Sequence, residues 1–278
     1  MAVFMDFLLR FSRNRPAVVG AIVLVAIFLL AVFGPMLYAV DPFEMLGRPT
    51  QPPSARFPLG TDVSGRDILA GLLNGARISL FVGFAASLGA TFLGVLVGSI
   101  AGYFGGLVDD ILMRIVDFFL TIPSFVLAVV IVAVLSPSLW VITATIAIVS
   151  WPSVARLVRG EFVSQRSREY VMACKGLGMS TPEIIVRQVL PNTLAPIVVV
   201  SSLMVATAIL TEAGLSFLGL SDPNLISWGY MIGIGRSVLR VAWWMAAIPG
   251  LAIMITVLAI NLVGEGLNDA LNPRLHQR

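Results

Sequence analysis

Long apolar runs alternate with short polar stretches along the chain. Crossing a bilayer takes about 20 apolar residues, and six runs are long enough. These runs cover residues 17–38, 78–103, 115–135, 139–157, 194–215 and 244–267. Because lipid offers no hydrogen-bond partner to the backbone, each run is expected to be a helix. The pattern predicts an all-α integral membrane protein with six transmembrane helices. A β-barrel, which would show short alternating segments, is disfavoured.

The polar stretches divide the chain into parts. The parts expected are a cytoplasmic N-terminus (1–16), the first span with an outer segment (17–77), a transmembrane core (78–267) with a cytoplasmic loop (158–193), and a cytoplasmic tail (268–278). Five prolines fall between residues 39 and 76, which favours an irregular, extended path there. Asp62 and Ser64 are expected to begin a short interfacial helix before the second span.

Composition supports the membrane class. Hydrophobic residues make up 58% of the chain and charged residues 12%, whereas soluble domains have about 25% charged residues. The single cysteine, Cys174, excludes an intrachain disulfide, and the single histidine, His276, argues against a His/Cys metal site. The 22-residue first run is long for a signal peptide, so it is expected to stay as a span.

The distribution of basic residues predicts the orientation. Placing both termini in the cytoplasm puts 12 of the 18 Lys and Arg residues on the inner side. The six on the outer side are Arg48, Arg56, Arg66, Arg77, Arg236 and Arg240. This bias follows the positive-inside rule and favours cytoplasmic termini.

The cytoplasmic loop has the pattern of a helix, a turn and a second helix. Gly176 and Gly178 interrupt the first helix, and Thr181, as the cap before Pro182, begins the second. Leu190-Pro191 is expected to end that helix before the fifth span. The element is too polar to insert and too small to fold alone. Two interpretations are open, an amphipathic linker lying on lipid and a knob that fits a groove on another protein.

A family resemblance favours the knob. The loop resembles the motif of permease subunits from binding-protein-dependent ABC importers, which runs Glu-Ala-Ala, three residues, Gly, nine residues, Ile-x-Leu-Pro. Met172-Ala173-Cys174 takes the first place, Gly178 the second and Leu190-Pro191 the last. Met172, Cys174 and Gln188 depart from the pattern, and Glu169, one turn away, is expected to replace the missing Glu.

Three further blocks extend the resemblance over most of the chain. They are FPLGTDVSGRDILAGLLNGARISL (57–80), EAGLSFLGLSDPNLISWGYMI (212–232) and NLVGEGLNDALNPR (261–274). They look like the dipeptide, oligopeptide and nickel permease group, in particular its second permease, with the long proline-rich outer segment. The resemblance implies a prokaryotic cytoplasmic membrane, a homologous second permease, two cytoplasmic ATPase subunits and an extracytoplasmic binding protein.

The resemblance also implies where energy enters. ATP and Mg²⁺ are expected on the ATPase subunits, with no cofactor in this chain, because Lys175, its only lysine, is followed by Gly176 and cannot complete a P-loop. The residues expected to couple to the ATPase are Glu169, Tyr170, Ala173, Cys174, Gly178, Pro182, Leu190 and Pro191. At Cys174, a small-residue contact with the partner is favoured over redox chemistry.

Several polar and small residues in the spans have two interpretations each. Asp117, expected near the start of its helix, Pro123 and Glu212 are pathway or gating candidates; ordinary alternatives are a helix-start carboxylate, a packing kink, and an acid paired with Arg236 or Arg240. Asp109 and Asp110 are expected to be solvated. The stripe Gly94, Gly98 and Gly102 favours packing within the chain, with a partner contact as the alternative. The segment 39–65 is expected either to contact the binding protein or cover the outer mouth, or to pack on the second permease.

The function predicted is therefore a non-enzymatic permease subunit of an ATP-driven importer, most simply of di- or oligopeptides. Nickel or another small solute is the alternative within the same family, and a self-contained secondary transporter is the alternative outside it. A secondary transporter usually shows internal repeats, which are not evident here. A membrane enzyme or a nucleic-acid partner finds no support in the residues.

Overall fold

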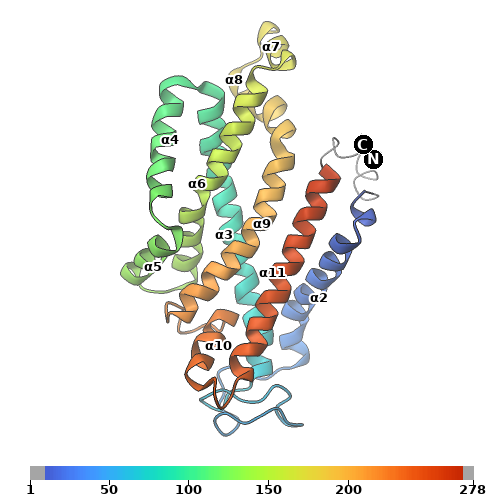
Figure 1. The fold of residues 1–278 in the computed structure, drawn as a ribbon, viewed down its shortest axis with the longest axis vertical. Helices are drawn as coiled ribbons and strands as arrows, with labels where there is room; N and C mark the ends of the chain where they lie inside the picture. Colours follow the sequence, from blue (N-terminus) through green and yellow to red (C-terminus); the bar gives the residue numbers. More distant parts are fainter. Residues whose placement is uncertain (1–9, 272–278) are drawn as a thin grey trace.

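The structure, a computed structural model, describes residues 10–271, and Figure 1 shows long helices running roughly along one axis. The regular structure in this range is helical, apart from isolated β-bridges at Met45–Arg66 and Thr61–Asp67. The helices are α2 (Arg15–Leu37), α3 (Ile68–Phe104), α4 (Gly106–Thr121), α5 (Ser124–Leu135), α6 (Leu139–Arg166), α7 (Glu169–Gly176), α8 (Thr181–Ile184), α9 (Leu190–Phe217), α10 (Trp228–Gly235) and α11 (Trp244–Leu271).

Five segments in the described range are long and apolar enough to cross a membrane, and α4 with α5 adds a sixth if the pair is one span. The all-α membrane fold predicted from the sequence is thus confirmed, but the third span is not one helix. α4 and α5 are bent by 84°. Ile122, the residue before Pro123, has extended backbone angles, as steric clash with a following proline favours, so α4 ends there.

The second span begins earlier than expected. Asp67 accepts hydrogen bonds from the backbone N–H groups of Leu69 and Ala70, and a single helix runs from there to Phe104. At 37 residues it is about 55 Å long, well beyond the thickness of a hydrocarbon core. The separate interfacial helix expected from Asp62 and Ser64 is therefore wrong. Asp62 instead accepts from the N–H groups of Ser64 and Arg66 in a tight turn.

The glycine stripe of α3 packs against α6 of the same chain. A Cβ added at Gly94 would lie 2.5 Å from Cβ of Val154, and one at Gly98 would lie 2.5 Å from the carbonyl oxygen of Ala155. One at Gly102 would lie 2.6 Å from Cβ of Phe162. The two helices are this close because the glycines have no side chains. Packing within the chain, one of the two interpretations of the stripe, is the one observed.

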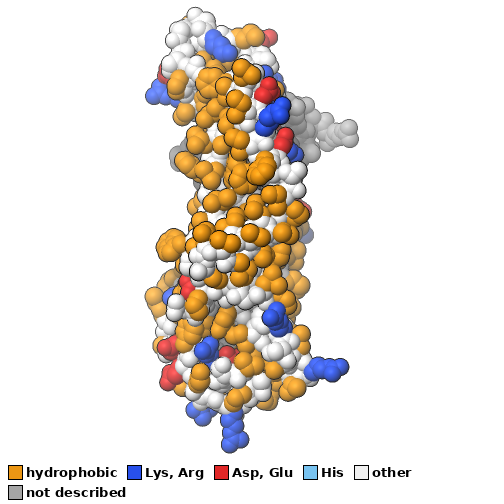
Figure 2. Space-filling view, turned by 90° about the vertical axis from the view of Figure 1, so that its left-hand side faces the viewer, with side chains coloured by type: hydrophobic (Ala, Val, Ile, Leu, Met, Phe, Trp, Pro, Cys, Tyr) orange, Lys and Arg blue, Asp and Glu red, His pale blue; other side chains and the backbone are white. Residues whose placement is uncertain are grey.

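The two ends of the molecule differ in build. Figure 1 shows α7 and α8 at one end, with α10 and the proline-rich segment (38–67) at the other. Figure 2 shows a broad apolar surface between them, with charged side chains gathered toward both ends. Exposed apolar side chains in the middle, such as Phe92 at 69%, suit a lipid environment or further subunits.

Candidate functional site

The element expected to dock on a partner is a compact knob at one end of the molecule. The knob comprises α7, the turn after it, α8 and a π-helical turn, Ile185–Val189. The backbone N–H of Gly178 donates to the carbonyl of Lys175, and that of Met179 donates to the carbonyl of Cys174. These two bonds end α7 in a Schellman motif, in which the glycine takes a φ of +80°. Other residues rarely adopt this conformation, so Gly178 sets the turn.

The knob has its own apolar interior. Val171, Ile184 and Val189 are at most 1% exposed and pack in one cluster with Phe162 of α6. The Tyr170 hydroxyl donates to Oε1 of Gln165 at 3.1 Å, which anchors α7 to the end of α6. This buried cluster packs the knob against α6 and the beginning of α9.

The residues predicted to couple to a partner divide into two sets. One set is exposed and available to a partner: Glu169, Ala173, Gly178, Pro182 and Pro191. The other packs, partly buried, against the interior of the knob: Tyr170, Cys174 and Leu190. Met172 and Leu177, 62% and 82% exposed, lie beside the first set. A side chain at position 178 would meet nothing within 4 Å in this chain, so close approach there is open to a partner.

Two details of the second helix differ from expectation. Ser180 rather than Thr181 occupies the cap position of α8, although the backbone turns where predicted. Leu190-Pro191 does not end the helix, because the π-helical turn leads directly into α9 and one helical segment runs from Thr181 to Phe217. The wider hydrogen-bonding pattern of a π turn accommodates Pro191, which has no N–H to donate.

Ion pairs tie α4 to the helix that carries the knob. Nε and Nη2 of Arg159 each donate to a carboxylate oxygen of Asp109 at 2.6 Å. Two further contacts involve the end of α3. Arg166 donates to the carbonyl of Gly102 at 3.1 Å, and the ammonium of Lys175 lies 5.3 Å from the ring centre of Tyr103. The expectation that Asp109 is solvated is therefore wrong. Asp109 is only 9% exposed, and the two hydrogen bonds from the guanidinium of Arg159 compensate its charge.

The predicted pathway candidates Asp117 and Pro123 lie on an exposed face of the broken third span. Asp117 is near the C-terminal end of α4, so the expectation that it stabilises a helix start is wrong. It accepts from Nη2 of Arg156 at 2.6 Å, and both side chains are more than half exposed. Pro123 is also exposed, at the break. An ion pair and a helix break on the surface of a spanning element do not suit contact with lipid.

Glu212, the third pathway candidate, is buried near the end of α9 that lies away from the knob. It is 3% exposed, and its carboxyl group contacts serine hydroxyls rather than arginine. The alternative of pairing with Arg236 or Arg240 is wrong. Arg236 donates to the carbonyl of Phe217 at 3.0 Å, and no described ion pair includes Glu212.

The proline-rich segment folds back onto its own chain. The Tyr38 hydroxyl donates to Oδ2 of Asp67, and burial together with this contact raises the pKa of Tyr38 to about 12. Thr61, fully buried, donates to the carbonyl of Arg48 at 2.6 Å. Gly65 lies against the carbonyl of Gly47, where an added Cβ could not fit. Irregular backbone was predicted here, and these contacts show how some of its polar groups find hydrogen-bond partners outside regular secondary structure.

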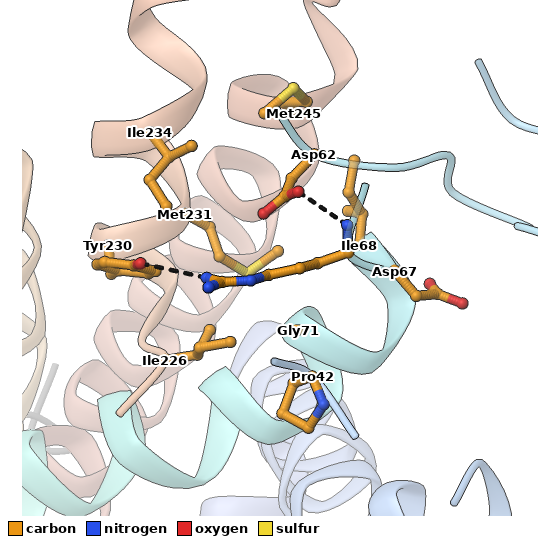
Figure 3. A pocket seen from close by; sticks show the side chains of 11 residues that line it. Pro42, Asp62, Asp67, Ile68, Gly71, Ile226, Tyr230, Met231, Ile234 and Met245 are labelled. Atoms are coloured by element: carbon orange, nitrogen blue, oxygen red, sulfur yellow. Dashed lines mark hydrogen bonds between the residues drawn. The ribbon is translucent and has the colours of Figure 1, made fainter. Parts of the chain in front are cut away.

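A small pocket separates this segment from α10. Figure 3 shows Tyr230 and Met231 of α10 facing Asp62 and Ile68 across it. The Tyr230 hydroxyl accepts from Nη1 of Arg66 at 3.5 Å, and Nε of Arg66 is buried without a partner. The cavity holds about 30 Å³, enough for one or two water molecules and far too little for a peptide. It is a junction between segment and helix rather than a substrate site.

Long apolar helices, a bent pair of shorter helices and a protruding polar knob define a multi-pass membrane protein. Residues 94–277 match the family model described as "Binding-protein-dependent transport system inner membrane component". Residues 3–56 match "N-terminal TM domain of oligopeptide transport permease C". The chain belongs to the family of binding-protein-dependent transport permeases of the bacterial inner membrane, as the motifs indicated.

Named relatives cover almost the whole chain. The "Dipeptide transport system permease protein DppC" of Alkalihalophilus pseudofirmus is 43% identical, over 96% of this chain and 88% of the relative. The "Oligopeptide transport system permease protein OppC" of Bacillus subtilis is 40% identical, over 100% of this chain and 92% of the relative. The "Di/tripeptide transport system permease protein DppC" of Pseudomonas aeruginosa is also 40% identical, over 97% and 92%.

The fold has a solved counterpart. A chain of the "MetNI methionine ABC transporter" in an inward-facing conformation superposes with a TM-score of 0.61. It covers 73% of this chain and 96% of its own, at 18% identity, so the likeness concerns the fold alone.

Sequence reasoning missed two sets of polar contacts. The ion pair between Asp109 and Arg159 joins residues 50 positions apart, and the only signal was an acidic pair after a glycine turn. The serine partners of Glu212 come from two helices, and a lone serine in an apolar run carries no distinctive pattern.

Proposed function

We propose that this chain is a permease subunit of an ATP-driven importer and forms half of a pathway for di- or oligopeptides. The observation that carries the proposal is the knob, an ordered docking element without a partner in this chain, in a protein whose full-length relatives are named peptide permeases. The neighbours in the assembly are a homologous second permease, two cytoplasmic ATPase subunits and an extracytoplasmic binding protein.

The exposed face of the knob is the proposed contact with an ATPase subunit. Ala173 and Gly178 present little side chain, so a partner surface can approach the backbone closely, and Pro182 stiffens the start of α8. Glu169 offers the carboxylate that the family motif has at the position of Met172. ATP and Mg²⁺ are bound by the partner, and closure of the two ATPase subunits displaces the knob. On this proposal the knob lies on the cytoplasmic side, and both chain termini are proposed to lie there too.

The pathway is proposed to run along the exposed face of α4 and α5. Backbone that leaves the helical pattern at membrane depth is tolerated where it lines water or is covered by protein. The break at Ile122–Pro123 and the ion pair between Asp117 and Arg156 both need such surroundings. The second permease is expected to face this surface, with the pathway between the two subunits.

The test is purification of the complex from native membranes through a tag on this chain, followed by reconstitution in vesicles. Mass spectrometry of the purified complex is expected to find two ATPase subunits, a second permease and a binding protein carrying peptides. Vesicles loaded with ATP are expected to accumulate a labelled dipeptide. A binding protein carrying nickel or a sugar would refute the peptide assignment and keep the importer. Isolation of this chain alone, under conditions that preserve known membrane complexes, would refute the importer.

A further inference from the structure

Glu212 occupies a junction of three helices that the proposed transport mechanism leaves without a role. The hydroxyl of Ser216, one turn along α9, donates to its Oε1 at 2.7 Å. The hydroxyl of Ser79, from α3, lies 3.5 Å from its Oε2 and donates to it. Ser227, which caps α10, lines the same small cavity as Glu212. The four residues are each no more than 3% exposed.

The junction fixes the start of α10. The Ser79 hydroxyl accepts from the backbone N–H of Trp228 at 3.2 Å, so one serine joins the glutamate to the first residue of α10. The indole N–H of Trp228 donates to the carbonyl of Leu72 at 3.0 Å, a second bond from α10 to α3. Gly229 approaches Ala213 of α9 so closely that an added Cβ would lie 2.5 Å from its Cα. α10 is thereby held between α3 and α9.

Glu212 and the knob lie at opposite ends of one helical segment. The segment from Thr181 to Phe217 is helical throughout, and at about 1.5 Å per residue Glu212 is about 46 Å from Thr181 along it. Figure 1 shows α8 and α9 leading from the knob toward α10. A displacement of the knob therefore has a continuous route to this junction, while α10, only eight residues long, has no span of its own to fix its position.

The surroundings indicate a role in hydrogen bonding rather than ion pairing. Arg236, on the same side of the molecule, is bound to the carbonyl of Phe217 and stacks on the ring of that residue. We propose that Glu212 is a positioning residue, whose carboxyl group fastens α9 to α3 and α10 so that movement of the knob also moves α10. The inference rests on the proposed importer function and assigns part of the coupling between knob and α10 to this group, beside the bond from Trp228 and the packing at Gly229.

The test compares three variants in the complete reconstituted complex with its ATPase subunits, second permease and binding protein. Glu212→Gln keeps a side chain that can accept and donate hydrogen bonds, and Glu212→Ala removes it. Ser79→Ala deletes only the hydroxyl between Glu212 and Trp228. Glu265→Ala, which removes an exposed carboxyl group on α11, is the matched control. Dipeptide uptake and ATP hydrolysis are measured together and expressed as uptake per ATP.

Glu212→Gln is expected to retain uptake per ATP close to wild type. Glu212→Ala is expected to lower uptake per ATP about tenfold, because the buried hydroxyls of Ser79 and Ser216 lose their acceptor. ATP hydrolysis is expected to continue at the wild-type rate. Ser79→Ala should lower uptake per ATP in the same direction and by less. If Glu212→Ala does not assemble, the other two variants decide. Uptake per ATP that falls with Gln as much as with Ala, or that Ser79→Ala leaves unchanged, would overturn the inference. A wild-type complex that takes up no peptide would instead refute the proposed function.

Discussion

Arg77 of α3 compensates a defect that a proline creates in α2. Pro35 lies inside α2 and has no N–H, so the carbonyl of Ala31, four residues earlier, loses its usual helical donor. Nε of Arg77 donates to that carbonyl at 2.6 Å, and Nη2 donates to the carbonyl of Val32 at 2.6 Å. One arginine therefore supplies the donor that the carbonyl of Ala31 lacks, and it joins the first span to the second.

A double-mutant cycle measures this coupling. Arg77→Met is expected to destabilise the chain by about 1–1.7 kcal/mol more when Pro35 is present than in Pro35→Ala. A hydrogen bond from a charged donor contributes roughly 1.5–3 kcal/mol, but polar contacts between membrane helices reach only about 1.7 kcal/mol. The smaller of these two estimates applies here because the side chain of Arg77 is exposed to its surroundings, although its acceptor residue Ala31 is buried. In Pro35→Ala the restored N–H serves Ala31, so the loss of Arg77 costs less.

The assay is the free energy of unfolding by a denaturing detergent, measured on the purified chain in mild micelles. Arg240→Met, at an exposed arginine near the start of α11, is the control and should show no coupling to Pro35. If Arg77→Met costs the same in both backgrounds, within about 0.5 kcal/mol, the two residues act independently and the argument is refuted.

Four further changes test other parts of the molecule. Gly178→Trp should insert normally and lose the ATPase subunits on purification; normal import would refute the docking assignment. Gly98→Leu should destabilise the α3–α6 contact by about 1–3 kcal/mol in the same unfolding assay, whereas Gly160→Ala, where a Cβ meets nothing within 4 Å, should not. Asp109→Asn should cost about 1–2 kcal/mol in that assay, because it removes the charge and one of the two acceptors of Arg159; an unchanged free energy of unfolding would contradict this. Deleting 44–56 should weaken uptake without preventing insertion; unchanged uptake kinetics would remove the role of that segment.

The spans were predictable because their signal is local. A run of apolar residues must become helix in lipid, whatever its neighbours, so five of the six predicted runs correspond to long helices. The turn at Gly178 was equally local, since a glycine after a helix favours the left-handed conformation that the Schellman motif needs. The start of α3 was misjudged because the apolar stretch was taken as the whole helix, although the helix capped by Asp67 begins at Ile68, ten residues before the predicted span.

The polar contacts were less predictable because they depend on which helices meet. Asp109 finds Arg159 only after α4 folds back along α6, and Glu212 finds Ser79 only after α3 and α9 pack. Proline was ambiguous for a related reason. Pro123 breaks a span, whereas Pro191, after a π-helical turn, does not end the helix, and the residue type alone does not separate these outcomes.

The broken third crossing has a consequence for how the chain enters the membrane during synthesis. α4 and α5 are about 24 Å and 18 Å long at 1.5 Å per residue, so neither matches a hydrocarbon core of about 30 Å. The apolar run is long enough to cross only when the two helices are taken together. Arg156 and Arg159, the ionic partners of α4, emerge from the ribosome later, on α6. We therefore expect α4 and α5 to take their final bent arrangement only after α6 has entered the bilayer and supplied these two arginines.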